Sequence, residues 1–143
     1  MGKIVNEGRR MIVLKNLIKL QGLFAIMSLA YLFASLWRQQ TIGEALSAAA
    51  IVPSILMFIV YSGCLLLPRL NRIAWYRVAM IVAIVLFGGG GVIGNVMRYF
   101  DSGLADYASF SAWAIAVAIN AFGTVLNTIA VFGLYKQRGV DDD

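Results

Sequence analysis

Four long apolar segments, separated by short polar ones, make up most of the chain. They cover approximately residues 20–37, 45–67, 78–97 and 110–135, and none of them contains Asp, Glu, Lys or Arg. A bilayer core about 30 Å thick is crossed by roughly 20 residues of helix rising about 1.5 Å each. The pattern therefore predicts an all-α integral membrane protein with four transmembrane helices.

The polar stretches between these segments are short, which favours an up-down bundle of sequential antiparallel neighbours. With 143 residues there is room for one four-span membrane domain, residues 1–143. Within this domain, a basic segment at 1–19 precedes the first apolar segment, and a short tail at 136–143 follows the fourth. Lys15 and Lys19 lie one helical turn apart, and two interpretations of them stay open. In the first, they belong to the start of the first helix and their side chains reach the lipid headgroups. In the second, they belong to an amphipathic helix that lies on the membrane surface.

Two local signals concern the second apolar segment. Thr41, followed three residues later by Glu44, forms a capping-box pattern that predicts the start of a helix there. Pro53 lies about a third of the way into the segment and predicts a kink, because proline removes a backbone hydrogen bond inside a helix.

The distribution of charge predicts the topology. The chain has 12 Lys and Arg residues, and all but Arg38 and Arg98 fall on one side if the chain crosses the membrane four times. Such an excess marks the cytoplasmic side, so we expect cytoplasmic N and C termini. The net charge of +5 is then explained by contact with anionic membrane lipids, not with nucleic acid. The compact layout favours a bacterial inner (cytoplasmic) membrane.

The composition argues against an enzyme. The chain contains no His, which removes the commonest general base and a common metal ligand. Its single cysteine, Cys64, forms neither an intramolecular disulfide nor a metal cluster. We therefore expect no catalytic residues, no metal and no cofactor.

Small and polar residues recur at helical spacing on one face of the third segment and one face of the fourth. Small residues let helix backbones approach closely in lipid, and amides bond between helices. One interpretation is that these faces hold the bundle or an oligomer together. The other is that the Asn and Arg side chains line a narrow polar path. The candidate residues for either role are Gly88, Gly91, Gly94, Asn95, Arg98, Ala116, Asn120, Gly123, Thr124 and Asn127.

Two of these features carry sharper expectations. Four consecutive glycines at 88–91 weaken a helix, so we expect a locally loosened helix or the close approach of another element. Asn120 lies near the middle of the fourth segment, where an unpaired amide is costly. We therefore expect its side chain to form a hydrogen bond to another helix.

The glycine run also belongs to a longer pattern. The third segment contains Gly-Gly-x-x-Gly-x-x-x-Arg-Tyr, formed by Gly90, Gly91, Gly94, Arg98 and Tyr99. This pattern resembles the signature of small four-span fluoride channels, which work as antiparallel dimers, and Gly123-Thr124 with Asn127 loosely resembles a second motif of that family. In the family the glycine motif lies in the first span, and the interval from Gly-Thr to Asn is one residue longer. We therefore do not carry the family's activity over to this chain.

The sequence favours a non-enzymatic membrane subunit or accessory protein that acts through helix–helix association. Its partners would be membrane lipids and either further copies of itself or other membrane subunits. The alternative is a small oligomeric channel or facilitator for an anion or a neutral solute, in which Arg98 and the asparagine face carry the function.

Overall fold

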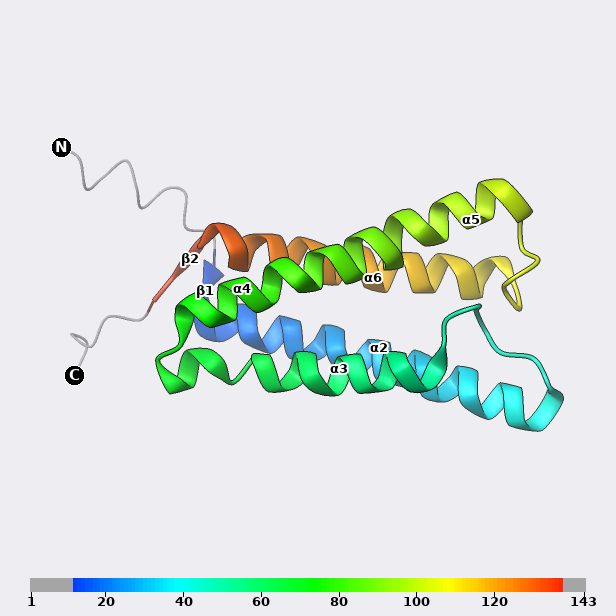
Figure 1. The fold of residues 1–143 in the computed structure, drawn as a ribbon, viewed down its shortest axis with the longest axis horizontal. Coiled ribbons are helices and arrows are strands. Elements are labelled where there is room, and N and C mark those ends of the chain that lie inside the picture. The colour runs from blue at the N-terminus through cyan, green and yellow to red at the C-terminus, as the bar shows by residue number, and fades with distance from the viewer. Residues whose placement is uncertain (1–11, 138–143) are drawn as a thin grey trace.

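The computed structural model describes residues 12–137. Within that range, four helical segments are long and apolar enough to cross a membrane: Leu14–Ile42, Ile51–Leu70, Ile73–Ser102 and Phe110–Phe132. Figure 1 shows them side by side and alternating in direction. The prediction of four long apolar helices is therefore confirmed.

The helical segments are divided into shorter elements. The first is the α-helix α2 (Leu14–Ile42). The second consists of α3 (Ile51–Cys64) and a 3₁₀ turn, η1 (Leu67–Leu70). The third runs through α4 (Ile73–Ala83), the π-helix η2 (Ile84–Gly94) and α5 (Asn95–Ser102), and the fourth is α6 (Phe110–Phe132). Two short strands, β1 (Ile12–Val13) and β2 (Tyr135–Lys136), pair in parallel.

The two ends of the bundle differ. One end, called here the termini end, holds β1, β2 and the turn at residues 65–72 (Figure 1). The opposite end, called the loop end, holds the connections at residues 43–50 and 103–109 (Figure 1). Helix α6 packs against α2 and against α4 and η2, and α2 also packs against α3.

Four aromatic side chains form the centre of the core. Phe24 of α2, Phe58 and Tyr61 of α3, and Phe87 of η2 have ring centroids between 4.8 and 6.4 Å apart. Five of the six ring pairs meet edge to face, which places the positive edge of one ring against the negative face of another. This aromatic cluster joins three of the four helical segments.

The first two helical segments differ from their expected bounds. Helix α2 begins at Leu14, so Lys15 and Lys19 lie in its first turns, as in the first of the two interpretations. The second segment begins at Ile51 rather than at 45. Polar contacts hold the intervening loop in a non-helical form. The Leu46 amide donates to Ser35 Oγ at 2.9 Å, and the Leu46 carbonyl accepts from the Ala108 amide at 3.1 Å.

The capping-box and kink predictions are both wrong. Thr41 lies in the last turn of α2, where its hydroxyl donates to the Trp37 carbonyl at 2.9 Å. The helix gives way to Gly43, whose φ of 77° suits a residue without a side chain. Pro53 lies in the first turn of α3, where backbone N–H groups have no helical partner. A proline there removes no helical hydrogen bond, and the observed start of the helix explains why it causes no kink.

The glycine run at 88–91 lies inside the π-helix η2. A π-helix has a wider turn than an α-helix and is most often a single bulge, whereas η2 extends over 11 residues. The expectation of a loosened helix is thus confirmed. Gly91 also packs so closely against Asn120 of α6 that a β-carbon on it would overlap the Asn120 side chain. The expectation of a close approach is confirmed at the same place.

Candidate functional site

A cavity of about 240 Å³ lies inside the bundle toward its loop end. Its walls come from α2, the 43–50 loop, α3, η2, α5 and α6, so all four helical segments contribute. The polar residues that line it are Ser28, Tyr31, Ser47, Ser54, Asn95, Arg98 and Asn120. At this size the cavity suits a small solute, because drug-sized ligands occupy pockets of roughly 300–1,000 Å³.

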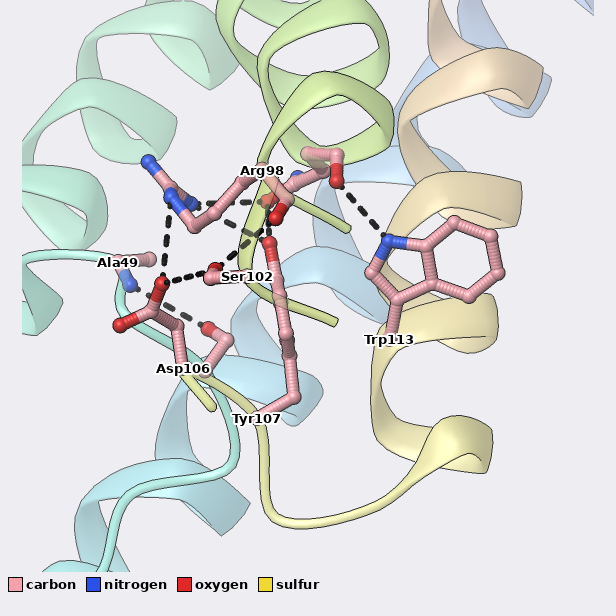
Figure 2. Close-up of polar contacts among 8 residues, drawn as sticks. Ala49, Arg98, Ser102, Asp106, Tyr107 and Trp113 are labelled. Carbon is pink, nitrogen blue, oxygen red and sulfur yellow. Dashed lines mark hydrogen bonds and ion pairs between the residues drawn. The ribbon is translucent and has the colours of Figure 1, made fainter. Parts of the chain in front are cut away.

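Arg98 is the only charged residue among the described ones that line this cavity, and α5 positions it beside the 103–109 loop. Its Nη1 donates to Asn95 Oδ1 at 3.3 Å and to the Tyr107 hydroxyl at 3.2 Å. Its Nε lies 3.9 Å from Asp106 Oδ2, and the two side chains are 41% and 43% exposed. A half-exposed ion pair of that length contributes little stability. The guanidinium is therefore held in place mainly by neutral partners (Figure 2).

The same region fixes the position of Asn95. The Tyr107 hydroxyl donates to Asn95 Oδ1, and Asn95 Nδ2 donates to the Gly91 carbonyl at 2.6 Å. The indole of Trp113 donates to the Asn95 backbone carbonyl at 3.0 Å, as Figure 2 shows. The start of α5 is thus tied to α6 and to the loop between them.

Asn120 lines the cavity, but its side chain does not form the expected hydrogen bond to another helix. Its Nδ2 donates to the Ala116 carbonyl of its own helix at 2.8 Å. The prediction of a hydrogen bond to another helix is therefore wrong. The close approach of Gly91 explains the difference, because the facing surface of η2 is bare backbone with no side chain to pair with.

The cavity ends against two aromatic rings of the core. Phe58 and Phe87 line it, and both belong to the aromatic cluster. The rings of Phe58 and Phe87 stack with centroids 4.8 Å apart. The aromatic cluster thus separates the cavity from the part of the bundle nearer the termini end.

Beyond the aromatic cluster, a buried polar cluster joins all four helical segments. Gln21 of α2 donates from Nε2 to Asn127 Oδ1 of α6 at 3.0 Å and to Met80 Sδ of α4 at 3.1 Å. Tyr61 of α3 donates to the same Asn127 oxygen at 2.7 Å, and Tyr76 of α4 donates to Gln21 Oε1. Gln21, Tyr76 and Asn127 are 0% exposed. Burial of these groups is tolerated because they pair with one another.

One group in this polar cluster lacks a partner within the described chain. Asn127 Nδ2 is buried and has no hydrogen-bond acceptor among residues 12–137. An unsatisfied buried donor costs about 1–3 kcal/mol. The two bonds that Asn127 Oδ1 accepts offset that cost.

Except for Gly94, the other candidate residues from the sequence occupy the interfaces of α6. Gly123 faces the Phe24 ring of α2, and Gly88 faces Thr124, whose Cγ2 would lie 3.1 Å from a β-carbon on Gly88. Ala116 is 7% exposed and lines the cavity. Gly94 faces the Gly89 carbonyl of its own helix rather than a neighbour. The candidate residues therefore divide between the cavity wall and contacts inside the bundle.

Sequence reasoning missed Gln21, Tyr61 and Tyr76, which build the buried polar cluster with Asn127. Gln21 was the available signal, since an amide inside an apolar helix is costly without a partner. It falls at the second residue of the segment expected to start at 20, where a polar residue is unremarkable. The helix starts at Leu14, which places Gln21 two turns inside it.

The polar groups that line the cavity are able to bind a small solute. Residues 12–137 contain no group of three His, Cys, Asp or Glu side chains that would hold a metal ion. The hydroxyl of Ser28, which lines the cavity, donates to the Phe24 carbonyl at 2.8 Å. The cavity offers one guanidinium together with amide and hydroxyl groups, which suit an anion or a neutral hydrogen-bonding solute.

Comparisons of the chain with protein-family models, curated proteins and solved structures gave no match.

Proposed function

We propose that this chain is a non-enzymatic integral membrane protein that facilitates the passage of a small anion or neutral solute. The observation that carries the proposal is the 240 Å³ cavity lined by Arg98 and polar side chains within four long apolar helices. The residues on its wall come from every helical segment, so a bound solute would contact the whole bundle.

Membrane insertion is supported by the outer surface. Trp37, toward the loop end, is 73% exposed, and Trp75, toward the termini end, is 63% exposed. Exposed tryptophans at both ends of apolar helices are typical of the two membrane interfaces. Between them the helices expose many large aliphatic side chains, which water disfavours and lipid accepts.

The orientation follows from the charges at the two ends. The described acidic residues, Glu44, Asp101 and Asp106, all lie toward the loop end. The described basic residues other than Arg38 and Arg98 lie toward the termini end; they are Lys15, Lys19, Arg69, Arg72, Arg77 and Lys136. The positive-inside rule then favours a cytoplasmic termini end. We infer a cavity that faces the outside of a bacterial inner membrane.

Passage of a solute requires the aromatic cluster to open. Phe58 and Phe87 lie between the cavity and the buried polar cluster. Opening them would give a solute access to the hydroxyls and amides of Tyr61, Gln21 and Asn127. In this proposal the aromatic cluster is the gate, and polar groups lie on both sides of it.

The test is flux in liposomes that contain the purified protein. Halides and nitrate are followed with ion-selective electrodes, and glycerol and urea by light scattering. We expect Asn120→Leu to abolish flux of the transported solute while the protein still assembles. Arg98→Gln should reduce the flux of anions, because it removes the guanidinium charge from the cavity wall.

Arg38→Gln is the matched control. Arg38 also lies at the loop end and pairs with Glu44 at 3.4 Å, but it does not line the cavity. The control should conduct like the unmodified protein. Equal flux through all three variants would exclude this cavity as the path of the solute. No flux through the unmodified protein with any solute in the panel would exclude the facilitator function for those solutes.

A second candidate is a subunit or accessory protein that acts through helix–helix association. It is favoured by Gly89 and Gly90, which are exposed on η2 with open space where their β-carbons would be. Bare helix backbone on the outside accepts a close neighbour in lipid. Native mass spectrometry of gently extracted protein tests this candidate. A stoichiometric foreign partner would support it, and a lone monomer would exclude it.

A further inference from the structure

A second cavity, of about 450 Å³, lies at the termini end, apart from the cavity described above. It is bounded by the first two turns of α2 on one side and by the turn between α3 and α4 on the other. Its lining residues are Val13, Leu14, Lys15, Ile18, Lys19, Pro68, Arg69, Asn71, Ile73 and Gln137. We call it the basic cavity, because its charged residues are all cationic.

The electrostatics of the basic cavity favour an anion. Lys15, Lys19 and Arg69 line it, and no described residue at this end is acidic. The ion pairs found within residues 12–137 are Arg38–Glu44 and Arg98–Asp106, both at the loop end. The three cations of the cavity are therefore uncompensated by any carboxylate in the described part of the chain.

Two helix N-termini add to this positive potential. Leu14 and Ile73, the first residues of α2 and α4, both line the cavity. Neither helix has a side-chain cap or an acidic residue in its first turn, so no described side chain neutralises the positive end of either dipole there. Aligned peptide dipoles place partial positive charge at such ends, which attracts anions.

The negative end of the α6 dipole also lies at this end of the bundle, and it is paired with a cation. Helix α6 finishes here, and its carbonyl groups would repel an anion. Arg77 donates from Nε at 2.8 Å to the Val131 carbonyl in the last turn of α6, and its Nη2 donates to the same oxygen. The negative end of α6 is thus paired with a cation that does not line the basic cavity.

The remaining lining is apolar, which points to the kind of anion. Leu14, Ile18 and Ile73 line the cavity beside the cations. It also lies at the end of apolar helices, at the level where lipid headgroups would lie in the proposed orientation. We propose that the basic cavity binds the phosphate headgroup of an anionic phospholipid, with Lys15, Lys19 and Arg69 around the phosphate and the apolar residues beside the glycerol and upper acyl chains. Basic pockets between membrane helices on the cytoplasmic side are known to bind such headgroups.

The test is native mass spectrometry of the full chain in detergent with phosphatidylglycerol or phosphatidylcholine added. The unmodified protein should bind phosphatidylglycerol more tightly than phosphatidylcholine. The variant Lys19→Gln/Arg69→Gln should bind it about 25-fold more weakly, because each cation near an anionic headgroup contributes roughly fivefold to binding. A second variant, Lys15→Gln/Lys19→Gln, alters only exposed side chains of α2 and should show a similar loss.

The matched control is Arg72→Gln/Lys136→Gln. It removes two positive charges from the same end, and neither residue lines the basic cavity. It should bind phosphatidylglycerol like the unmodified protein. An equal loss in the control would overturn the proposal, since the total charge of the end and not the cavity would then explain binding.

A parallel arm distinguishes a lipid from a soluble anion. Inorganic phosphate is added in place of lipid, with chloride at the same ionic strength as its reference. We expect inorganic phosphate neither to displace phosphatidylglycerol nor to raise the melting temperature above that in chloride. Displacement of the lipid by inorganic phosphate would overturn the lipid assignment and indicate a site for a free anion.

Discussion

Replacing Gly123 by alanine tests a close contact between two helices in the core. Gly123 of α6 faces the ring of Phe24 on α2. A β-carbon at this position would lie 2.6 Å from Phe24 Cδ2 and closer still to Cε2 and Cζ. Carbon atoms in favourable contact are about 3.5–4.0 Å apart. One helix must therefore move by about 1 Å, or the ring must turn.

The surroundings of Phe24 leave it little room to move. Its side chain is 0% exposed, and its ring centroid lies 5.0 Å from that of Phe87 and 5.5 Å from those of Phe58 and Tyr61. Overpacking of this kind costs about 1–3 kcal/mol. Alanine recovers about 1 kcal/mol through its better helix propensity. We expect Gly123→Ala to lower the free energy of unfolding by up to about 2 kcal/mol, and Gly123→Leu to prevent this packing altogether.

The assay is reversible unfolding in mixed micelles with increasing SDS, followed by tryptophan fluorescence. Gly22→Ala is the matched control, because Gly22 lies in the interior of α2 and a β-carbon added there would have nothing within 4 Å. The control should be as stable as the unmodified protein or slightly more so. If Gly123→Ala matched Gly22→Ala in stability, the close contact with Phe24 would not exist in the folded protein.

Three other substitutions inside the bundle, and one control on its surface, have distinct expected outcomes. Gly91→Leu should disrupt the contact of η2 with α6, because the new side chain would overlap Asn120. Gly89→Leu is its control: the leucine side chain would point into open space, so this variant should be as stable as the unmodified protein in the same unfolding assay. Asn127→Ala should destabilise the fold by about 1–3 kcal/mol, because it leaves the Gln21 amide and the Tyr61 hydroxyl without their shared acceptor. Tyr61→Phe keeps the ring and removes one hydrogen bond, so its loss should be smaller, about 0.6 kcal/mol; a larger loss than that of Asn127→Ala would contradict the hydrogen-bond assignment.

The helices themselves were predictable because the signal for them is long and redundant. Each apolar segment extends over some 20 residues, and no single position decides its assignment. The starts of the helices were less predictable. The loop at 43–50 is held open by the bond from the Leu46 amide to Ser35 and by the bond from the Ala108 amide to the Leu46 carbonyl. These partners are 11 and 62 residues away in the sequence, so local propensity at Thr41 and Glu44 carries no information about them.

The candidate site was predictable in part, for a similar reason. The spacing of Gly88 and Gly91 correctly places them toward α6, because close approach needs only the absence of a side chain. Which asparagine bonds between helices depends instead on what faces it. Asn120 faces the bare backbone of Gly91, whereas Asn127 faces Gln21 and Tyr61. The two asparagines lie on one face of the same helix, and only the neighbouring helices distinguish them.

The positions of these contacts also bear on the two candidate functions. The small residues that favoured an association role, Gly88, Gly91 and Gly123, are already in contact with side chains of the same chain. They therefore cannot also receive a helix from a partner. An association role must instead use residues that remain open, and Gly89 and Gly90 are the ones that η2 presents outward. Gly90 also lines the loop-end cavity, so a partner helix seated there would cover one wall of it. Gly89 does not line the cavity, so a bulky substitution there should distinguish the two candidate functions. If the chain acts by association, the substitution would impair assembly with the partner. If the chain is a facilitator that acts as a monomer, the substitution would leave the flux of solute unchanged.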